Sequence, residues 1–249
     1  MLVLGVDIGG SGLKGAVVDV SSGELRSERI RLDTPKPSTP ERMAQTFQQL
    51  TEKLQWTGLV GCGFPSIVRN GVALTASNID KNWIGQNIED LFHQKTGLQV
   101  AALNDADAAG YAEMNFGKGQ GQMGTVLLLT IGSGIGSALF VNGHEVPNTE
   151  FGHLFLHGMI AEHYVSNSAR KKLGLSWDKW GKRFNEYLQH LELLFSPDLF
   201  ILGGGISKDF EQYQKQLKVK TPVTPARLLN NAGIVGAASY AWRRHTNQL

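Results

Sequence analysis

The chain has 249 residues, enough for one large domain or two smaller ones with a substantial hydrophobic core. Hydrophobic residues make up 41% and charged residues 18%, which is typical of a globular protein and excludes disorder as the main state. Lys and Arg number 24 against 22 Asp and Glu, and this net charge of +2 gives no indication of nucleic-acid binding. The single cysteine, Cys62, cannot form an internal disulfide. Because no stretch is long and apolar enough for a membrane helix and no signal peptide is recognisable, we expect a cytoplasmic protein without a membrane partner.

Two glycine turns, each flanked by apolar runs, give the chain an internal repeat. Residues 2–6 and 13–20 predict strands around a turn at 7–12, and residues 126–130 and 137–141 predict a second such pair. The two stretches align with Asp7 over Thr130, 123 residues later. This repeat indicates a duplicated core, and we expect two similar lobes with a cleft between them.

Helical and strand patterns alternate along the rest of the chain. Thr39 before Pro40 is a typical start for the first helix, and Gly97 a typical end for the second. The predicted helices are 40–54, 88–96, 106–116, 162–173, 177–195 and one that begins near Ala232; the further predicted strands are 59–64, 100–103 and 199–202. Alternation of this kind predicts an α/β architecture.

Three glycine loops follow predicted strands, and such loops let backbone amides approach a phosphate closely. A single loop of this kind is more often only a tight turn, but three together favour anion binding. None is a P-loop or a dinucleotide-binding motif, since the required spacing is missing and the first two loops lie between strands. The loops contain Gly9, Gly10, Ser11 and Gly12; Gly132, Ser133 and Gly134; and Gly203, Gly204 and Gly205, with Lys208 just after them.

An acid and a base flank the first loop. Asp7 precedes the glycines, and Lys14 follows them at a distance from which a hairpin could return it to the same place. Mg²⁺ bound to phosphate needs only one or two carboxylates, so Asp7 is a candidate Mg²⁺ ligand, directly or through water. The alternative is that Asp7 only stabilises the turn through an Asx hydrogen bond.

Several motifs resemble the ROK family of sugar kinases, within the wider sugar kinase, Hsp70 and actin superfamily. Residues 7–15, DIGGSGLKG, resemble its first phosphate loop. The further motifs, which are similar to those of the polyphosphate-using glucokinases of the family, are TPKP (34–37), GCGFPS (61–66), TASNIDKNW (75–83), NDADAAG (104–110), VPNTEFGHL (146–154), FSPDLFILGGG (195–205) and NNAGIVGAA (230–238). The resemblance implies a two-lobed α/β fold of the actin, Hsp70 and sugar kinase type, which is ribonuclease H-like. We expect lobes at 1–105 and 106–233, with helix 234–249 packed back on the first.

A kinase of this kind needs a carboxylate that orients the attacking hydroxyl and accepts its proton. Asp105 and Asp107 both follow a predicted strand, at the end where α/β sheets present ligand-binding groups. The residue pattern does not separate them, and Asp105 could also cap the next helix. The resemblance selects Asp105 as the catalytic base, with Asn104 beside it as a ligand of a sugar hydroxyl.

Sugar recognition requires polar groups aimed at each hydroxyl. The resemblance assigns this role to Glu150 and His153, in the Glu-x-Gly-His motif, and to Glu162 after it. It also places Asn78 and the turn formed by Gly63, Phe64 and Pro65 beside the sugar. Many ROK proteins hold a structural zinc with one histidine and three cysteines, but residues 153–162 contain no cysteine. We therefore expect no structural zinc.

The expected activity is phosphoryl transfer from inorganic polyphosphate to the 6-hydroxyl of glucose, with Mg²⁺ and in a homodimer. The alternatives are an ATP-dependent hexokinase and, from another functional class, a non-catalytic sugar-sensing protein. A helix-turn-helix segment is not expected, because the first predicted strand starts at Leu2. A set of basic residues could form a path for the polymer: Lys14, Lys81, Arg170, Lys171, Lys172, Lys182, Arg183 and Lys208.

Overall fold

The computed structural model describes residues 1–248, which form two compact units. Unit 1 comprises Met1–Phe116 and the residues from Asn231 onward, and unit 2 comprises Gly117–Asn230. The division falls after Phe116 and not after residue 105 as expected, because helix α3 (Asp105–Phe116) packs against helix α8 (Ala232–His245) of unit 1. A Cβ on Gly236 of α8 would lie 1.6 Å from the Ala108 carbonyl oxygen, so only glycine permits this approach.

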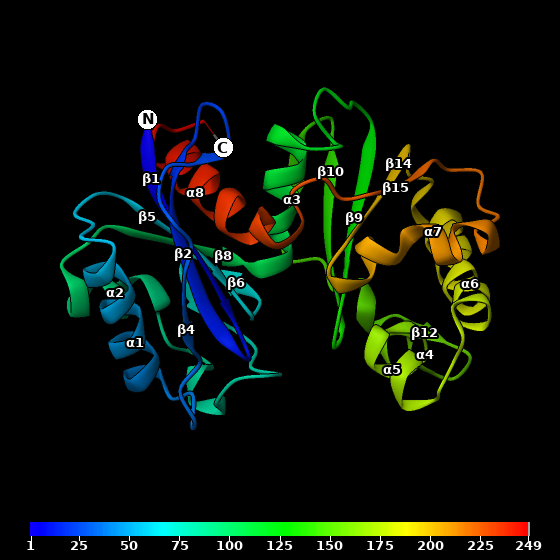
Figure 1. Ribbon diagram of the computed structural model, residues 1–249, viewed down its shortest axis with the longest axis horizontal. Helices are drawn as coiled ribbons and strands as arrows, with labels where there is room; N and C mark the ends of the chain where they lie inside the picture. The colour runs from blue at the N-terminus through cyan, green and yellow to red at the C-terminus, as the bar shows by residue number, and fades with distance from the viewer. Residues whose placement is uncertain (249) are drawn as a thin grey trace. The chain divides into compact units, whose positions relative to one another are not determined.

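Unit 1 is built on a six-stranded sheet in the order β3-β2-β1-β5-β8, with β4 also paired to β2 (Figure 1). Strands β1, β5 and β8 run parallel, whereas β2 is antiparallel to β1, β3 and β4. The strands are β1 (Leu2–Gly9), β2 (Gly12–Asp19), β3 (Glu24–Leu25), β4 (Ile30–Asp33), β5 (Val60–Phe64) and β8 (Val100–Asn104), and a separate hairpin joins β6 (Val68–Arg69) to β7 (Val72–Ala73).

Helices cover both faces of this sheet. On one face, α8 lies so close to β1 and β5 that a Cβ on Gly5 or Gly61 would collide with its backbone. On the other face, α1 (Pro40–Lys53) and α2 (Ile88–Thr96) pack together, and the rings of Phe47 and Phe92 stack at 4.2 Å. The short helix η1 (Lys81–Trp83) adds the buried Trp83 to this core. The helices cover the two faces of the sheet, and polar residues lie at or just after the carboxyl ends of β1, β5 and β8.

Unit 2 contains a five-stranded sheet in the order β11-β10-β9-β14-β15. Trp180, Phe184 and Tyr187 of its long helix α6 are fully buried in the core of the unit. The strands are β9 (Thr125–Ile131), β10 (Ile135–Val141), β11 (His144–Val146), β14 (Leu199–Gly203) and β15 (Val223–Pro225), with a hairpin of β12 (Phe155–Leu156) and β13 (Met159–Ile160). The helices are η2 (Phe151–His153), α4 (Ala161–Val165), α5 (Asn167–Lys172), α6 (Trp177–Phe195), η3 (Gly205–Asp209), α7 (Phe210–Tyr213), η4 (Gln214–Gln216) and η5 (Leu229–Asn231).

The structure confirms the α/β alternation, adds short helices and strands that were not predicted, and divides one predicted helix. The pattern at 162–173 predicts a single helix, but α4 and α5 are separate because Ser166 has an extended backbone, with φ −65° and ψ 161°. Its hydroxyl accepts a hydrogen bond from the Ala169 amide and caps the second helix. Within residues 1–248, none of the helices is both long enough and apolar enough to cross a bilayer.

Candidate functional site

The carboxyl ends of three parallel strands in unit 1 bring the first glycine loop and the Asp105 region to one sheet edge. Asp7 of β1 pairs with Gly63 of β5, and Phe64 of β5 pairs with Asn104 of β8. Because neighbouring strands are about 4.8 Å apart, the loop end of β1 and the end of β8 are separated by roughly 10 Å. The strand register thus places Asp7 on one side of β5 and Asp105, which follows Asn104, on the other side.

The first glycine loop is a tight hairpin in which Gly9 pairs with Gly12. The Lys14 ammonium donates to Oδ2 of Asp7 at 3.0 Å, so the hairpin does return the lysine to the acid. Asp7 makes no Asx hydrogen bond among the described residues, and its Oδ1 accepts no hydrogen bond. Gly9, Gly10 and Gly12 do not have a positive φ. Glycine at these positions therefore removes a side chain from the loop and is not needed for a left-handed conformation. A Cβ on Gly9 would meet only the Gly12 carbonyl oxygen, at 3.7 Å.

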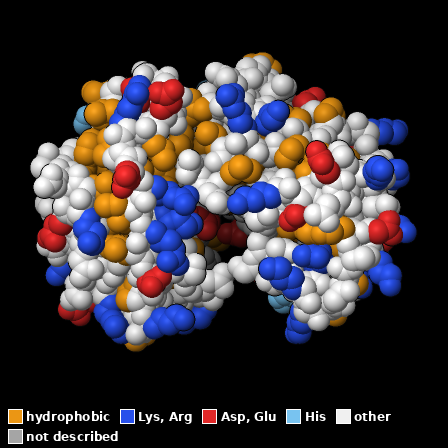
Figure 2. Space-filling model, in the orientation of Figure 1, with side chains coloured by type: hydrophobic (Ala, Val, Ile, Leu, Met, Phe, Trp, Pro, Cys, Tyr) orange, Lys and Arg blue, Asp and Glu red, His pale blue; other side chains and the backbone are white. Residues whose placement is uncertain are grey.

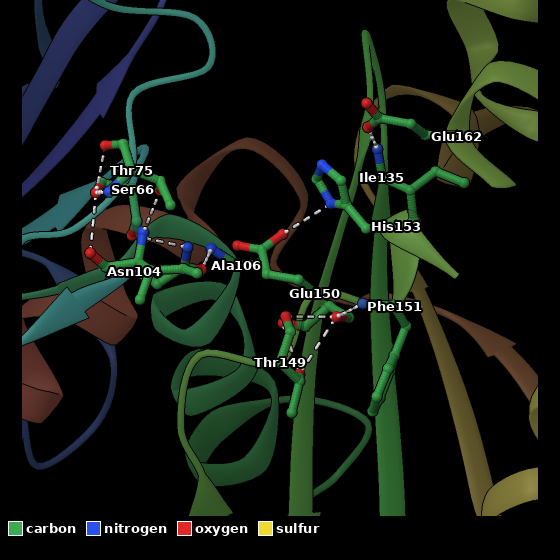
Figure 3. A network of polar contacts seen from close by, with 12 residues as sticks. Ser66, Thr75, Asn104, Ala106, Ile135, Thr149, Glu150, Phe151, His153 and Glu162 are labelled. Carbon is green, nitrogen blue, oxygen red and sulfur yellow. Dashed lines mark hydrogen bonds and ion pairs between the residues drawn. The ribbon is translucent and has the colours of Figure 1, made fainter. Parts of the chain in front are cut away.

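Asn104, and not Asp105, caps helix α3 (Figure 3). Its Oδ1 accepts from the Ala106 and Asp107 amides at 2.8 and 3.2 Å, and its Nδ2 donates to the Ser66 carbonyl oxygen at 3.0 Å. One N–H of the Asn104 amide therefore remains for a ligand. Asp107 is 1% exposed, whereas Asp105 is only partly buried. Of the two carboxylates that the sequence left open, Asp105 is the more exposed.

The end of β5 packs closely against Asp105. A Cβ on Gly63 would lie 3.6 Å from the Asp105 Cα. Pro65 follows Phe64 at the strand end, and the next residue, Ser66, donates to the Thr75 carbonyl oxygen at 2.8 Å, tying the turn to residues 75–78. Asn78 is exposed and lies against the glycine hairpin, since a Cβ on Gly10 would meet its carbonyl oxygen at 3.4 Å. The sugar and phosphate candidates of unit 1 are therefore neighbours.

In unit 2, Glu150 and His153 point toward each other across the short helix η2 (Figure 3). The His153 Nδ1 lies 3.6 Å from a Glu150 carboxylate oxygen. Burial raises the pKa of Glu150, the His153 imidazole opposes that rise, and the negative charge of Glu162 adds to it. A half-buried carboxyl of this kind can accept or donate a hydrogen bond at a sugar hydroxyl.

Two residues that the sequence did not single out hold this segment in place. The Ser137 hydroxyl of β10 accepts from the Phe151 amide at 2.9 Å and donates to the Thr149 carbonyl oxygen at 2.6 Å. A Cβ on Gly152 would lie 2.3 Å from the Ile135 carbonyl oxygen, so glycine is required where η2 approaches β10. The Glu-x-Gly-His motif contains Gly152, so the sequence could have indicated its importance. The contacts of Ser137 with residues 149 and 151 depend on the fold and have no signal in the sequence.

Glu162 anchors the second glycine loop. Its carboxylate accepts a hydrogen bond from the Ile135 amide at 3.2 Å, and a Cβ on Gly134 would meet the same oxygen at 2.4 Å. Glu162 therefore holds the loop in place, because its Oε2 accepts the hydrogen bond from the Ile135 amide. The sequence predicted a sugar ligand at this position and did not indicate the contact with the loop.

The second and third glycine loops lie side by side, because Gly203 of β14 pairs with Thr130 of β9. Gly204 has φ 76° and approaches the Ile131 backbone, where a Cβ would lie 2.4 Å from the carbonyl oxygen. Gly132 and Gly205 face open space, with no atom within 4 Å of an added Cβ. The remaining members of the predicted donor set, Ser133 and the exposed Lys208, flank these openings. The Cα positions of Gly132 and Gly205 are thus open, whereas the Gly132 amide donates to the Gly134 carbonyl oxygen at 3.0 Å.

The proposed basic path is only partly available. Arg170 stacks on Trp177 at 3.8 Å and Arg183 on Tyr164 at 4.6 Å, so both guanidinium groups serve local packing. Three more cations have partners, Lys14 with Asp7, Lys81 with the Ala76 carbonyl oxygen and Lys182 with Asp178. Within the described residues, Lys171, Lys172 and Lys208 are exposed and make no ion pair.

The surroundings of Asp7 are compatible with Mg²⁺. In the part of the chain that the structure describes, no three His, Cys, Asp or Glu side chains gather as a metal-ligand cluster. Mg²⁺ retains several waters and needs few protein ligands. Asp7, whose Oδ1 carries no hydrogen bond, satisfies that requirement.

Comparison with known proteins gives consistent relatives. Residues 3–167 match the ROK family. The chain is 47% identical over 235 residues to a polyphosphate glucokinase of Mycobacterium tuberculosis (strain CDC 1551 / Oshkosh), covering 94% of this chain and 89% of that protein. It is similar to the crystal structure of an inorganic polyphosphate/ATP-glucomannokinase from Arthrobacter sp. strain KM, with TM-score 0.94, 45% identity and coverage of 98% and 99% of the two chains. A ROK family glucokinase from Streptomyces griseus, solved with glucose and AMPPNP, has TM-score 0.82 at 25% identity and coverage of 98% and 100%.

Proposed function

Because this chain belongs to the ROK family, we propose that it transfers a phosphoryl group from inorganic polyphosphate to the 6-hydroxyl of glucose, giving glucose 6-phosphate. The observation that carries the proposal is near full-length similarity, at 47% identity, to a polyphosphate glucokinase. Family membership also confirms the resemblance seen in the motifs and the predicted sugar-kinase type of α/β fold.

In this reaction Asp105 is the general base. The glucose 6-oxygen attacks the terminal phosphorus, the bond from that phosphorus to the bridging oxygen breaks, and Asp105 accepts the hydroxyl proton. The shortened polyphosphate leaves with the bridging oxygen. Asn104 supports the base by fixing the first turn of α3 and offers its remaining N–H to a sugar hydroxyl.

The donor's terminal phosphates bind at the glycine loops through backbone amides. In unit 1 these are the amides of Gly9, Gly10, Ser11 and Gly12, with the Lys14 ammonium beside Asp7. Mg²⁺, held by Asp7 directly or through water, would supply neutralisation of the charge on the phosphate oxygens. In unit 2 the proposed donor groups are the loops at 132–134 and 204–205 with Lys208.

Glucose specificity is assigned to polar groups of each unit. In unit 1, Gly63 lies close to Asp105, and Asn78 lies against the glycine hairpin at Gly10. In unit 2, Glu150, His153 and Glu162 are the proposed sugar ligands, with Glu150 kept partly desolvated. A site that pairs each hydroxyl rejects analogues that lack one.

ATP is a second candidate donor, and one observation favours it: the Arthrobacter structure is described as a polyphosphate/ATP enzyme. The test is a donor comparison with purified protein, measuring glucose 6-phosphate from glucose with long-chain polyphosphate, ATP or GTP. We expect polyphosphate to have the highest kcat/KM. Turnover with ATP and none with polyphosphate would refute the donor assignment and leave the sugar-kinase assignment intact.

The working form of the enzyme is proposed to be a cytoplasmic homodimer. This rests on the family resemblance, and light scattering of the purified protein tests the subunit number. A scattering mass near the 27.2 kDa of one chain would contradict the dimer.

A further inference from the structure

A row of charges crosses the first hairpin on the face of the sheet where Asp7 lies against Gly233 of α8. Asp7, Lys14 and Arg31 are direct cross-strand partners on β1, β2 and β4, so their side chains lie on one face of the sheet. The antiparallel register thus adds an arginine to the Asp7–Lys14 pair. Nothing in the local sequence around Arg31 indicates this placement, because it depends on the pairing of β4 with β2.

Arg31 lies directly over the glycine loop. Its Nη2 donates to the Ser11 carbonyl oxygen at 2.9 Å, and a Cβ on Gly12 would lie 2.9 Å from its Nε. Glycine at position 12 therefore leaves room for the guanidinium group beside the loop. The Arg31 Nη1 also contacts Asp33 at 2.7 Å. A guanidinium has five N–H donors, so these two bonds leave three for another ligand.

Arg29 extends the cationic surface along the same face, two residues before Arg31. Its Nη1 lies 3.4 Å from Oδ1 of Asn231, the residue at the start of α8, and it is exposed. Figure 2 shows Lys and Arg side chains gathered over the region where Figure 1 draws β2 and β4. We define Lys14, Arg29 and Arg31 as the hairpin basic patch.

We infer that Arg31, together with Arg29, binds phosphate units of the polymer beyond those held by the first glycine loop, and so favours long-chain polyphosphate as the donor. The inference rests on the proposed function and names residues of the donor site that neither the motifs nor the resemblance assigned. Each phosphate unit of the polymer presents oxygens that a guanidinium can bind with two hydrogen bonds. A nucleoside triphosphate has only three phosphates and cannot occupy the patch beyond the loop to the same extent.

The alternative is that Arg31 only stabilises the surface by pairing with Asp33. That pair is weak, since Asp33 is 83% exposed and exposed ion pairs contribute little. A polyanion that displaces Asp33 gains a stronger, charge-assisted contact and releases its counterions. If Arg31 binds the donor, its removal should change how the affinity for polyphosphate depends on salt concentration. If Arg31 only pairs with Asp33, that dependence should stay the same.

The test compares Arg31→Gln with Arg26→Gln. Arg26 is a matched control: its side chain is 48% exposed, against 50% for Arg31, and it pairs with Asp19 at 3.2 Å toward the other end of β2. Steady-state kinetics with long-chain polyphosphate and with ATP are measured at several salt concentrations. Binding of long-chain polyphosphate without glucose is measured by calorimetry on the same proteins.

We expect Arg31→Gln to raise the KM and Kd for long-chain polyphosphate about tenfold, as for loss of one charge-assisted contact. It should flatten the dependence of log KM on log salt concentration by about 0.7, by analogy with one contact to a single-stranded nucleic acid. The KM for glucose should stay unchanged, Arg31→Lys should recover part of the salt dependence, and Arg26→Gln should behave as wild type.

Equal polyphosphate affinity and equal salt dependence in Arg31→Gln and Arg26→Gln would overturn the inference, as would failure of the wild type to bind polyphosphate. The proposed function fails separately, if wild type makes no glucose 6-phosphate from the polymer. Selective loss of polymer binding in Arg31→Gln would then still support the patch as a polyphosphate-binding surface.

Discussion

Gly152 offers a sharp test of how unit 2 positions its sugar-binding groups. In Gly152→Ala the new Cβ would lie 2.3 Å from the Ile135 carbonyl oxygen, whereas real Cβ atoms keep at least 3.0 Å. The two must separate by about 0.7 Å, and the contact is with the backbone of β10, so no flexible side chain can absorb the change. The hydrogen bonds of Ser137 with Thr149 and Phe151, just before Gly152, limit the relaxation further.

Displacement of this size moves Glu150 and His153 together, because they flank Gly152. Misplacement of substrate-positioning groups by about 1 Å can lower rates about 100-fold, and we expect a loss of roughly this size in kcat/KM for glucose. The KM for polyphosphate should change little. The control is Gly158→Ala, where an added Cβ meets no atom within 4 Å but φ is 75°, so it should lose stability with little change in the KM for glucose.

The assay is steady-state kinetics with each substrate varied in turn, together with circular dichroism to establish that both variants fold. A folded Gly152→Ala enzyme with wild-type kcat/KM for glucose would refute the reasoning.

Three further predictions concern single residues. Burial raises the pKa of Glu150, so ionisation of this carboxyl destabilises the fold as the pH rises through its raised pKa. Glu150→Gln should therefore raise Tm at pH 7, and this gain should vanish below the ordinary pKa of 4.5. Thermal unfolding of wild type and variant at pH 7 and below pH 4.5 measures the difference. Asn104→Ala should lower the free energy of unfolding by about 1 kcal/mol or more, measured in urea, because it removes the α3 cap. Cys62 is fully buried and its thiol pKa is raised, so it should react with a thiol reagent only after denaturation.

Local signals were sufficient for most of the helices and central strands. Thr39 and Gly97 cap α1 and α2 as predicted, because capping depends on a few neighbouring residues. The same local reasoning failed at Ser166, where a hydroxyl inside a helical pattern caps a new helix instead. The acid and base of the first loop were also predicted, since a tight hairpin alone brings Lys14 back to Asp7.

Features that depend on pairing between distant segments were not predictable. The short strand β4 carries little hydrophobic pattern, and only its register with β2 places Arg31 beside Lys14. Asn104 was expected to bind sugar, but its contact with the Ser66 carbonyl oxygen requires β5 and β8 to be neighbours. The difference in burial between Asp105 and Asp107 likewise arises only in the folded unit, where α3 packs against α8, more than 100 residues away in the chain.

The central claim, that the chain is a kinase whose base is Asp105, is tested most directly by the turnover of Asp105→Asn at saturating glucose and polyphosphate. The substitution preserves shape and removes the proton acceptor, so kcat should fall about 100-fold or more. Glucose binding, measured by calorimetry, should stay close to that of the wild type. A variant that retained near wild-type kcat would contradict the assignment of Asp105 and the mechanism built on it.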